Sequence, residues 1–131
     1  MAELSYPLSE HRDAVTSVSG RTVAQMTLAA AVAGELTAAD IRISPVTLHA
    51  QAAFAERGGN PQLAENLRRG AELATLDDDE LLGFYEALRP GRSTADELRQ
   101  LADALASRGA PRCAALVREA CDAYLRRGLI P

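Results

Sequence analysis

The sequence predicts an all-α protein built around one small helical domain, and three observations point to it. The 131 residues include 26 Ala and 18 Leu but only 3 Tyr, 2 Phe and no Trp. Ala and Leu are strong helix formers, whereas sheets favour aromatic and β-branched residues. Capping residues and Gly or Pro breakers recur at helix-length intervals, and apolar residues return every three or four positions, as one face of a helix requires.

The first 20 residues are expected to form an extended arm, followed by a single helical domain over residues 21–131. Pro7 disfavours helix in the preceding Tyr6, and residues 17–20 (Ser-Val-Ser-Gly) have the composition of a turn. We expect this arm to lie along a surface rather than to pack as a regular element.

Two short helical segments are expected after the arm. Thr27 caps a helix that ends at Ala33, where Gly34 supplies the left-handed stop. The spacing of Thr37 and Asp40 is that of a capping box with Asp in place of Glu, and it predicts a turn that ends near Arg42.

Five longer helices follow, each opened by a capping residue or a proline and closed by Gly or Pro. The expected spans are 44–57, 60–75, 77–88, 93–108 and 111–127. One shared core is predicted within the last three, made of Leu98, Leu101, Leu105, Leu116, Val117, Ala120 and Tyr124. The apolar stripes are narrow and rich in Ala, so they provide few large side chains to anchor a core.

Residues that could carry chemistry are sparse. His11 and His49 have no Cys or second His at metal-ligand spacing, so both are expected in surface or packing roles. Cys113 and Cys121 are eight residues apart on one helix, too far for a disulfide, and are expected to be buried thiols. No catalytic, cofactor-binding or metal-ligating residue is predicted.

Two charged clusters each allow a functional and a structural interpretation. Residues 77–80 (Asp-Asp-Asp-Glu) could hold a divalent cation, but they lie where a helix should begin and are expected to cap it and complement its dipole. Arg89 and Arg92 flank a helix start, where they could bind an anion. Bridging to carboxylates, within the fold or on another chain, is favoured.

Overall charge disfavours two classes of partner. The net charge is −4, with 4 basic and 6 acidic residues in 1–60 and 10 and 12 in 61–131. Neither half attracts nucleic acid or an anionic membrane, and a helix-turn-helix DNA-binding protein is disfavoured. No apolar run approaches a membrane span and the N-terminus does not look like a signal peptide, so a cytoplasmic location is expected.

Several collinear segments resemble the small subunit of adenosylcobalamin-dependent diol and glycerol dehydratases, from about Leu4 to Ile130. The most specific stretch is 87–98, followed by 41–51. The others are Tyr6-Pro7-Leu8, Ser19-Gly20-Arg21-Thr22, Ala71-Glu72-Leu73 and Val117-Arg118-Glu119-Ala120.

The resemblance implies a complex of large, medium and small subunits, usually two of each. It implies that the large, barrel-shaped subunit holds the substrate and a metal ion, and that adenosylcobalamin lies between the large and medium subunits. An adenosyl radical would then convert a vicinal diol, propane-1,2-diol or glycerol, to an aldehyde. The small subunit would supply no catalytic group, and its fold would be an open three-helix bundle with additional N-terminal helical structure.

Four residues are the interface candidates: Tyr6 as an apolar anchor from the arm, and Arg42, Arg89 and Arg92 at helix ends within the family-like segments. The alternative for each arginine is pairing within the small fold. For the whole chain, the alternative function is a free-standing helical adaptor without enzymatic partners. Some family members carry a long N-terminal extension associated with bacterial microcompartments; this sequence begins almost directly at Tyr6-Pro7-Leu8, which gives encapsulation no support.

Overall fold

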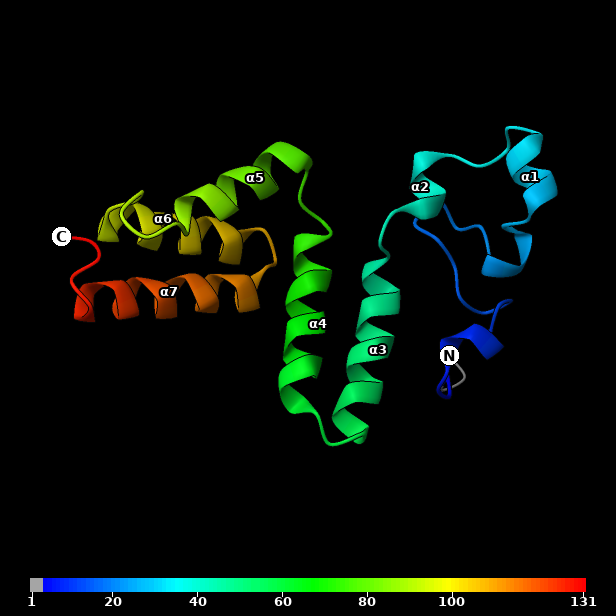
Figure 1. Ribbon diagram of the computed structural model, residues 1–131, viewed down its shortest axis with the longest axis horizontal. Helices are drawn as coiled ribbons and strands as arrows, with labels where there is room; N and C mark the ends of the chain where they lie inside the picture. Colours follow the sequence, from blue (N-terminus) through cyan, green and yellow to red (C-terminus); the bar gives the residue numbers. More distant parts are fainter. Residues whose placement is uncertain (1–3) are drawn as a thin grey trace. The chain divides into compact units, whose positions relative to one another are not determined.

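A computed structural model describes residues 4–131, and it is all-α over that range, with no strand. Its α-helices are α1 (Leu28–Val32), α2 (Ala38–Ile41), α3 (Pro45–Arg57), α4 (Pro61–Leu73), α5 (Asp78–Ala87), α6 (Ala95–Ser107) and α7 (Pro111–Arg126) (Figure 1). The predicted helix starts and stops are confirmed to within two residues. Contacts divide the chain into Met1–Ala71, the N-terminal unit, and Glu72–Pro131, the C-terminal unit.

The expected arm contains more local structure than its sequence suggested. A short 3-10 helix, Leu8–Glu10, lies within it, and a second one, Val23–Gln25, follows it. The predicted turn at 17–20 is confirmed, since Gly20 N donates to Ser17 O (3.0 Å) and an isolated antiparallel bridge joins Thr16 to Thr22. The boundary at residue 20 and the single domain over 21–131 stay predictions.

Helix ends follow the local chemistry of the sequence. Capping boxes are present at Thr37, Asp77 and Thr94, where each side chain and its partner three residues on satisfy each other's backbone N–H. Ser44 occupies the N-cap of α3, but its side chain makes no capping hydrogen bond. Pro45 at the first helical position, with its fixed φ, is the local feature that favours this helix start.

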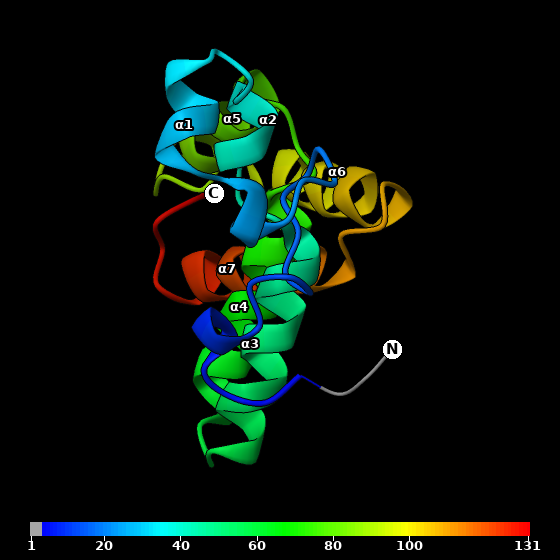
Figure 2. The ribbon, with the colours of Figure 1, turned by 90° about the vertical axis from the view of Figure 1, so that its right-hand side faces the viewer.

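The N-terminal unit has an unusual distribution of side chains. Helices α3 and α4 lie side by side in both views (Figures 1 and 2), joined by the turn at 58–60. Its only buried apolar residues are alanines among those the structure describes: Ala30, Ala52, Ala64 and Ala71. No large apolar side chain described in this unit is fully buried.

Among residues 4–131, the large side chains that are buried together all lie in the C-terminal unit, where they form a cluster. Leu98, Leu105 and Val117 are buried in it, and Leu101 and Tyr124 pack against it, as predicted. The prediction is wrong for Leu116 and Ala120, which are only half-buried and outside this cluster. Its other buried members are Phe84, Ala102, Ala110, Cys113, Ala114, Cys121 and Ile130. The face of α7 that packs inward carries Cys113, Val117 and Cys121, and Leu116 and Ala120 lie beside it.

Candidate interaction surfaces

The residues considered for chemistry lie apart from one another. Across residues 4–131, no three His, Cys, Asp or Glu side chains gather closely enough to hold a metal ion. His11 is hydrogen-bonded to Ser5 (2.9 Å) at the surface. Cys113 and Cys121 are buried thiols, as predicted. Described helices also include none that is both long and apolar enough to cross a membrane.

The acidic run at 77–80 is part of a helix cap, as expected. Asp77 accepts a hydrogen bond from Glu80 N (2.8 Å), and the Glu80 side chain accepts one from Asp77 N (3.1 Å). The remaining two carboxylates lie in the first turn of α5, where they complement the helix dipole.

Arg89 and Arg92, two of the interface candidates, share one carboxylate. Glu86 pairs with Arg89 Nη1 at 3.5 Å and with Arg92 Nε at 3.1 Å. The side chains of both arginines are more than 60% exposed, so water screens these pairs strongly. Two cations on one anion leave an excess positive charge at this end of α5, still accessible to a second carboxylate.

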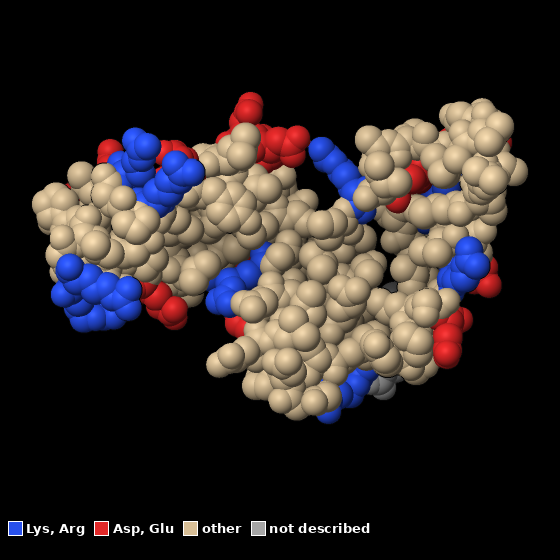
Figure 3. All heavy atoms as spheres, in the orientation of Figure 1, with Lys and Arg blue, Asp and Glu red and all other residues tan. Residues whose placement is uncertain are grey.

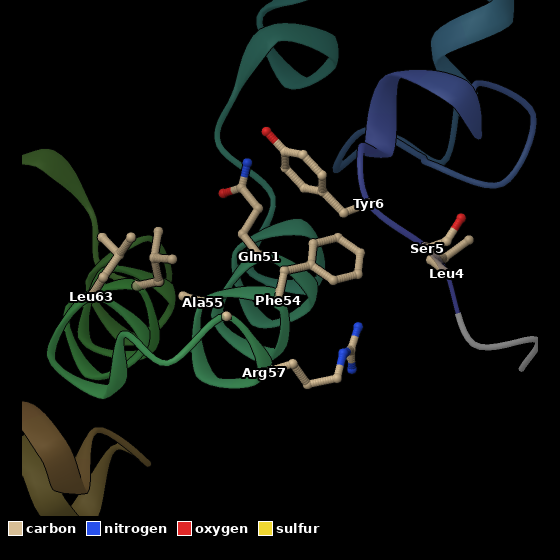
Figure 4. A pocket seen from close by; sticks show the side chains of 10 residues that line it. Leu4, Ser5, Tyr6, Gln51, Phe54, Ala55, Arg57 and Leu63 are labelled. Carbon is tan, nitrogen blue, oxygen red and sulfur yellow. The ribbon is translucent and has the colours of Figure 1, made fainter.

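Tyr6, another candidate, borders an apolar groove in the N-terminal unit (Figure 4). Its ring meets Phe54 edge to face at 5.9 Å between centroids, yet the residue is 79% exposed. The Arg57 guanidinium lies over the Phe54 ring, 5.0 Å from its centroid. The groove encloses about 980 Å³ and is also lined by Leu4, Leu63 and Leu67.

Arg42 lies between two exposed isoleucines at the junction of α2 and α3. Ile41 is 80% exposed and Ile43 is 66% exposed. Arg42 makes no ion pair with any other residue in the described range. It is therefore an exposed cation, flanked in sequence by two exposed apolar residues, with its hydrogen-bonding groups available to a partner.

Asp40 is the buried charge beside this junction, and the sequence identified only its capping role. Its carboxylate accepts hydrogen bonds from Ser19 Oγ, Thr37 N (2.7 Å) and Thr37 Oγ1 (3.0 Å), and Arg21 Nε lies 3.6 Å away. The Ser19 hydrogen bond, followed by those from Thr37, lowers the pKa of Asp40 from 3.8 to about 2. This carboxylate joins the turn at 17–20 to α2.

Glu72 has a structural role that sequence reasoning missed. It accepts hydrogen bonds from Arg112 N (3.1 Å) and Cys113 N (2.8 Å), at the first turn of α7. Ala110 at the N-cap has no side-chain acceptor, so Glu72 takes that role from 40 residues away. Local spacing cannot reveal a cap provided by a distant helix.

Comparison with known proteins decides the family. The chain matches the family described as "Dehydratase small subunit" over residues 1–130. It belongs to this dehydratase small subunit family. It is 44% identical over 124 residues to the propanediol dehydratase small subunits of Citrobacter freundii and of Salmonella typhimurium strain LT2. In each case the match covers 93% of this chain and 72% of the relative.

As a dehydratase small subunit, the chain is one component of a larger lyase. The resemblance inferred from collinear segments is thereby confirmed. Its two most specific segments correspond to connections between helices: 87–98 spans the end of α5 to the start of α6, and 41–51 spans the junction of α2 and α3. Three of the four interface candidates, Arg42, Arg89 and Arg92, lie in these connections.

Proposed function

We propose that this chain is the non-catalytic small subunit of a diol dehydratase that converts a vicinal diol, propane-1,2-diol or glycerol, to an aldehyde. The observation that carries the proposal is the 44% identity to two propanediol dehydratase small subunits along nearly the whole chain. The partners are a large barrel subunit and a medium cobalamin-binding subunit, two copies of each, in the cytoplasm.

In this proposal the other subunits bind adenosylcobalamin, which supplies the radical that starts the reaction. The described residues of this chain do not fit that cofactor. Neither histidine lines the apolar groove, and His11 is engaged by Ser5 at the surface. No reaction step is therefore assigned to residues of this chain.

The role left to the chain is to bind and stabilise its partners. Tyr6, Arg42, Arg89 and Arg92 are proposed as contact residues, because Tyr and Arg are enriched at protein interfaces. All four are exposed. Arg also bridges carboxylates through two parallel hydrogen bonds, which favours it in a contact with another chain. The extended arm over residues 1–20 is proposed to be ordered against a partner subunit.

Coexpression with the large and medium subunits tests the proposal. The purified complex should release aldehyde from propane-1,2-diol or glycerol when adenosylcobalamin is added, and the isolated chain should release none. A chain that does not copurify with these subunits, or that turns over diol alone, would contradict it. The first outcome would favour the alternative, a free-standing helical adaptor, which the exposed apolar side chains of the N-terminal unit would also suit.

A further inference from the structure

We infer that an exposed aliphatic face of the N-terminal unit is covered by another dehydratase subunit, through an apolar surface that carries a carboxylate. We use the name aliphatic face for the five strongly exposed aliphatic side chains of the segment 28–46: Leu28, Val32, Ile41, Ile43 and Val46. The inference rests on the proposed function and adds the surface that binds, and the chemistry of what it binds.

Burial in the N-terminal unit is reversed relative to an ordinary domain. Large aliphatic side chains normally lie inside, and alanine alone offers little area to bury. Here the buried apolar residues described are alanines, whereas the five members of the aliphatic face are 65% to 82% exposed. In the C-terminal unit, by contrast, Leu98, Leu105 and Val117 are buried.

Helix α1 is the clearest case. It has five residues, Leu-Ala-Ala-Ala-Val, and only Ala30 is buried. Leu28 and Val32 are four residues apart, so they share one face, and each is more than 80% exposed. A helix that is apolar all round is normally buried, and one this short is far below the roughly 12–15 residues needed for stability in water.

Charge identifies the complementary chemistry. Residues 27–47 contain three charged side chains: Glu35, Asp40 and Arg42. Arg21 pairs with both acids, at 3.8 Å from Glu35 and 3.6 Å from Asp40. Arg42 is left as the one charge of this segment without an ion pair among the described residues. Mostly uncharged side chains cover α1 and α2 in the space-filling view (Figure 3). An apolar partner surface with a carboxylate facing Arg42 matches this pattern.

A second copy of this chain fits the aliphatic face poorly. In a two-fold dimer the same patch meets itself, so Arg42 would enter an interface whose two acids already pair with Arg21. The five side chains are also few beside the roughly 20–30 residues that each partner contributes to a standard stable interface. A larger contact with a different subunit satisfies both requirements.

The test uses the coexpressed complex and two variants of the aliphatic face. The double variant Leu28→Gln/Val32→Gln keeps helix propensity because Gln is a good helix former. Arg42→Glu reverses the unpaired charge and changes no buried group. Matched controls are Leu125→Gln in α7, at an exposed leucine, and Arg99→Glu in α6, at an exposed arginine paired with Asp96.

The double variant is expected to weaken retention of the chain by the complex at least tenfold, and Arg42→Glu several-fold, with both controls near wild type. Equal retention of all variants, with wild type assembling normally, would overturn this inference and leave the proposed function standing. So would equal weakening by Leu125→Gln, or self-association of the isolated chain that Leu28→Gln/Val32→Gln abolishes. Failure of the wild-type chain to assemble would instead refute the proposed function, and the inference with it.

Discussion

Replacing Arg92 with Ala separates a contact residue from a residue that only stabilises the small fold. In the isolated chain, Arg92 Nε lies 3.1 Å from Glu86 Oε1, and Arg89 holds the other oxygen at 3.5 Å. Removing Arg92 leaves Glu86 paired with Arg89. Exposed ion pairs contribute roughly 0–1 kcal/mol, so the free energy of unfolding should change by less than about 1 kcal/mol.

The expected effect in the complex is larger. A charged side chain that meets a carboxylate in a water-excluded contact costs about 2–5 kcal/mol when truncated, and every 1.4 kcal/mol is a factor of ten in affinity. Arg92→Ala should therefore weaken binding to the large and medium subunits at least tenfold.

Thermal melting of the isolated chain and titration of the subunits against each other measure the two quantities. Arg99→Ala is the matched control for the melting measurement, since Arg99 Nη1 lies 2.9 Å from Asp96 at the same sequence separation as Arg89 and Glu86. A lower melting temperature for Arg92→Ala without any loss of association would refute the reasoning and assign Arg92 to the fold alone.

Three further outcomes are expected. Leu105→Ala should lower the free energy of unfolding by about 2–5 kcal/mol in urea titration, because Leu105 is 4% exposed in the C-terminal core; a loss below about 1 kcal/mol would contradict the core assignment. Asp40 has a lowered pKa in the folded chain, so its stabilising contribution is present above pH 4 and is lost as pH falls toward 2. Melting curves recorded between pH 4 and pH 2 should show a loss of stability in the wild type that is smaller in Asp40→Asn. Identical losses in the two proteins would show that Asp40 is not responsible for the loss of stability. Glu72→Ala should lower stability by about 1–3 kcal/mol, because two N–H groups at the start of α7 lose a charged acceptor, and Glu119→Ala, at an exposed position of α7, provides the control; equal losses for both variants would argue against the cap.

The helices could be predicted from sequence because the residues that start and stop each helix lie within a few positions of its ends. Thr37, Asp77 and Thr94 form capping boxes with residues three positions away, so the chemistry that starts each helix lies within one turn of chain. Thr22 and Gln25 have the same spacing, and their capping box marks the start of the 3-10 helix at Val23–Gln25. The apolar spacing also predicted the shared core of the last three helices, with the exception of Leu116 and Ala120 on α7.

The interaction surfaces were likewise predictable only where they depend on residues close together in sequence. Sequence resemblance placed Arg89 and Arg92 in a family-like connection, but it could not show that both pair with Glu86, since pairing depends on how the chain turns after α5. The aliphatic face was also beyond prediction. Leu28 and Val32 are apolar and four residues apart, which is typical of core positions on a helix. Only the structure shows that both are exposed.

The sequence by itself determined the helical class, the helix boundaries and the dehydratase small subunit family, because each is encoded in residues close together or in collinear order. Tertiary structure decided which side chains are buried: alanines in the N-terminal unit, Leu98, Leu105 and Val117 in the C-terminal unit. It also decided that Glu72 caps a helix 40 residues away and that Arg21 pairs with both acids of the neighbouring segment. The physical reason is that burial and long-range pairing depend on distances in space, which helical periodicity along the chain does not fix.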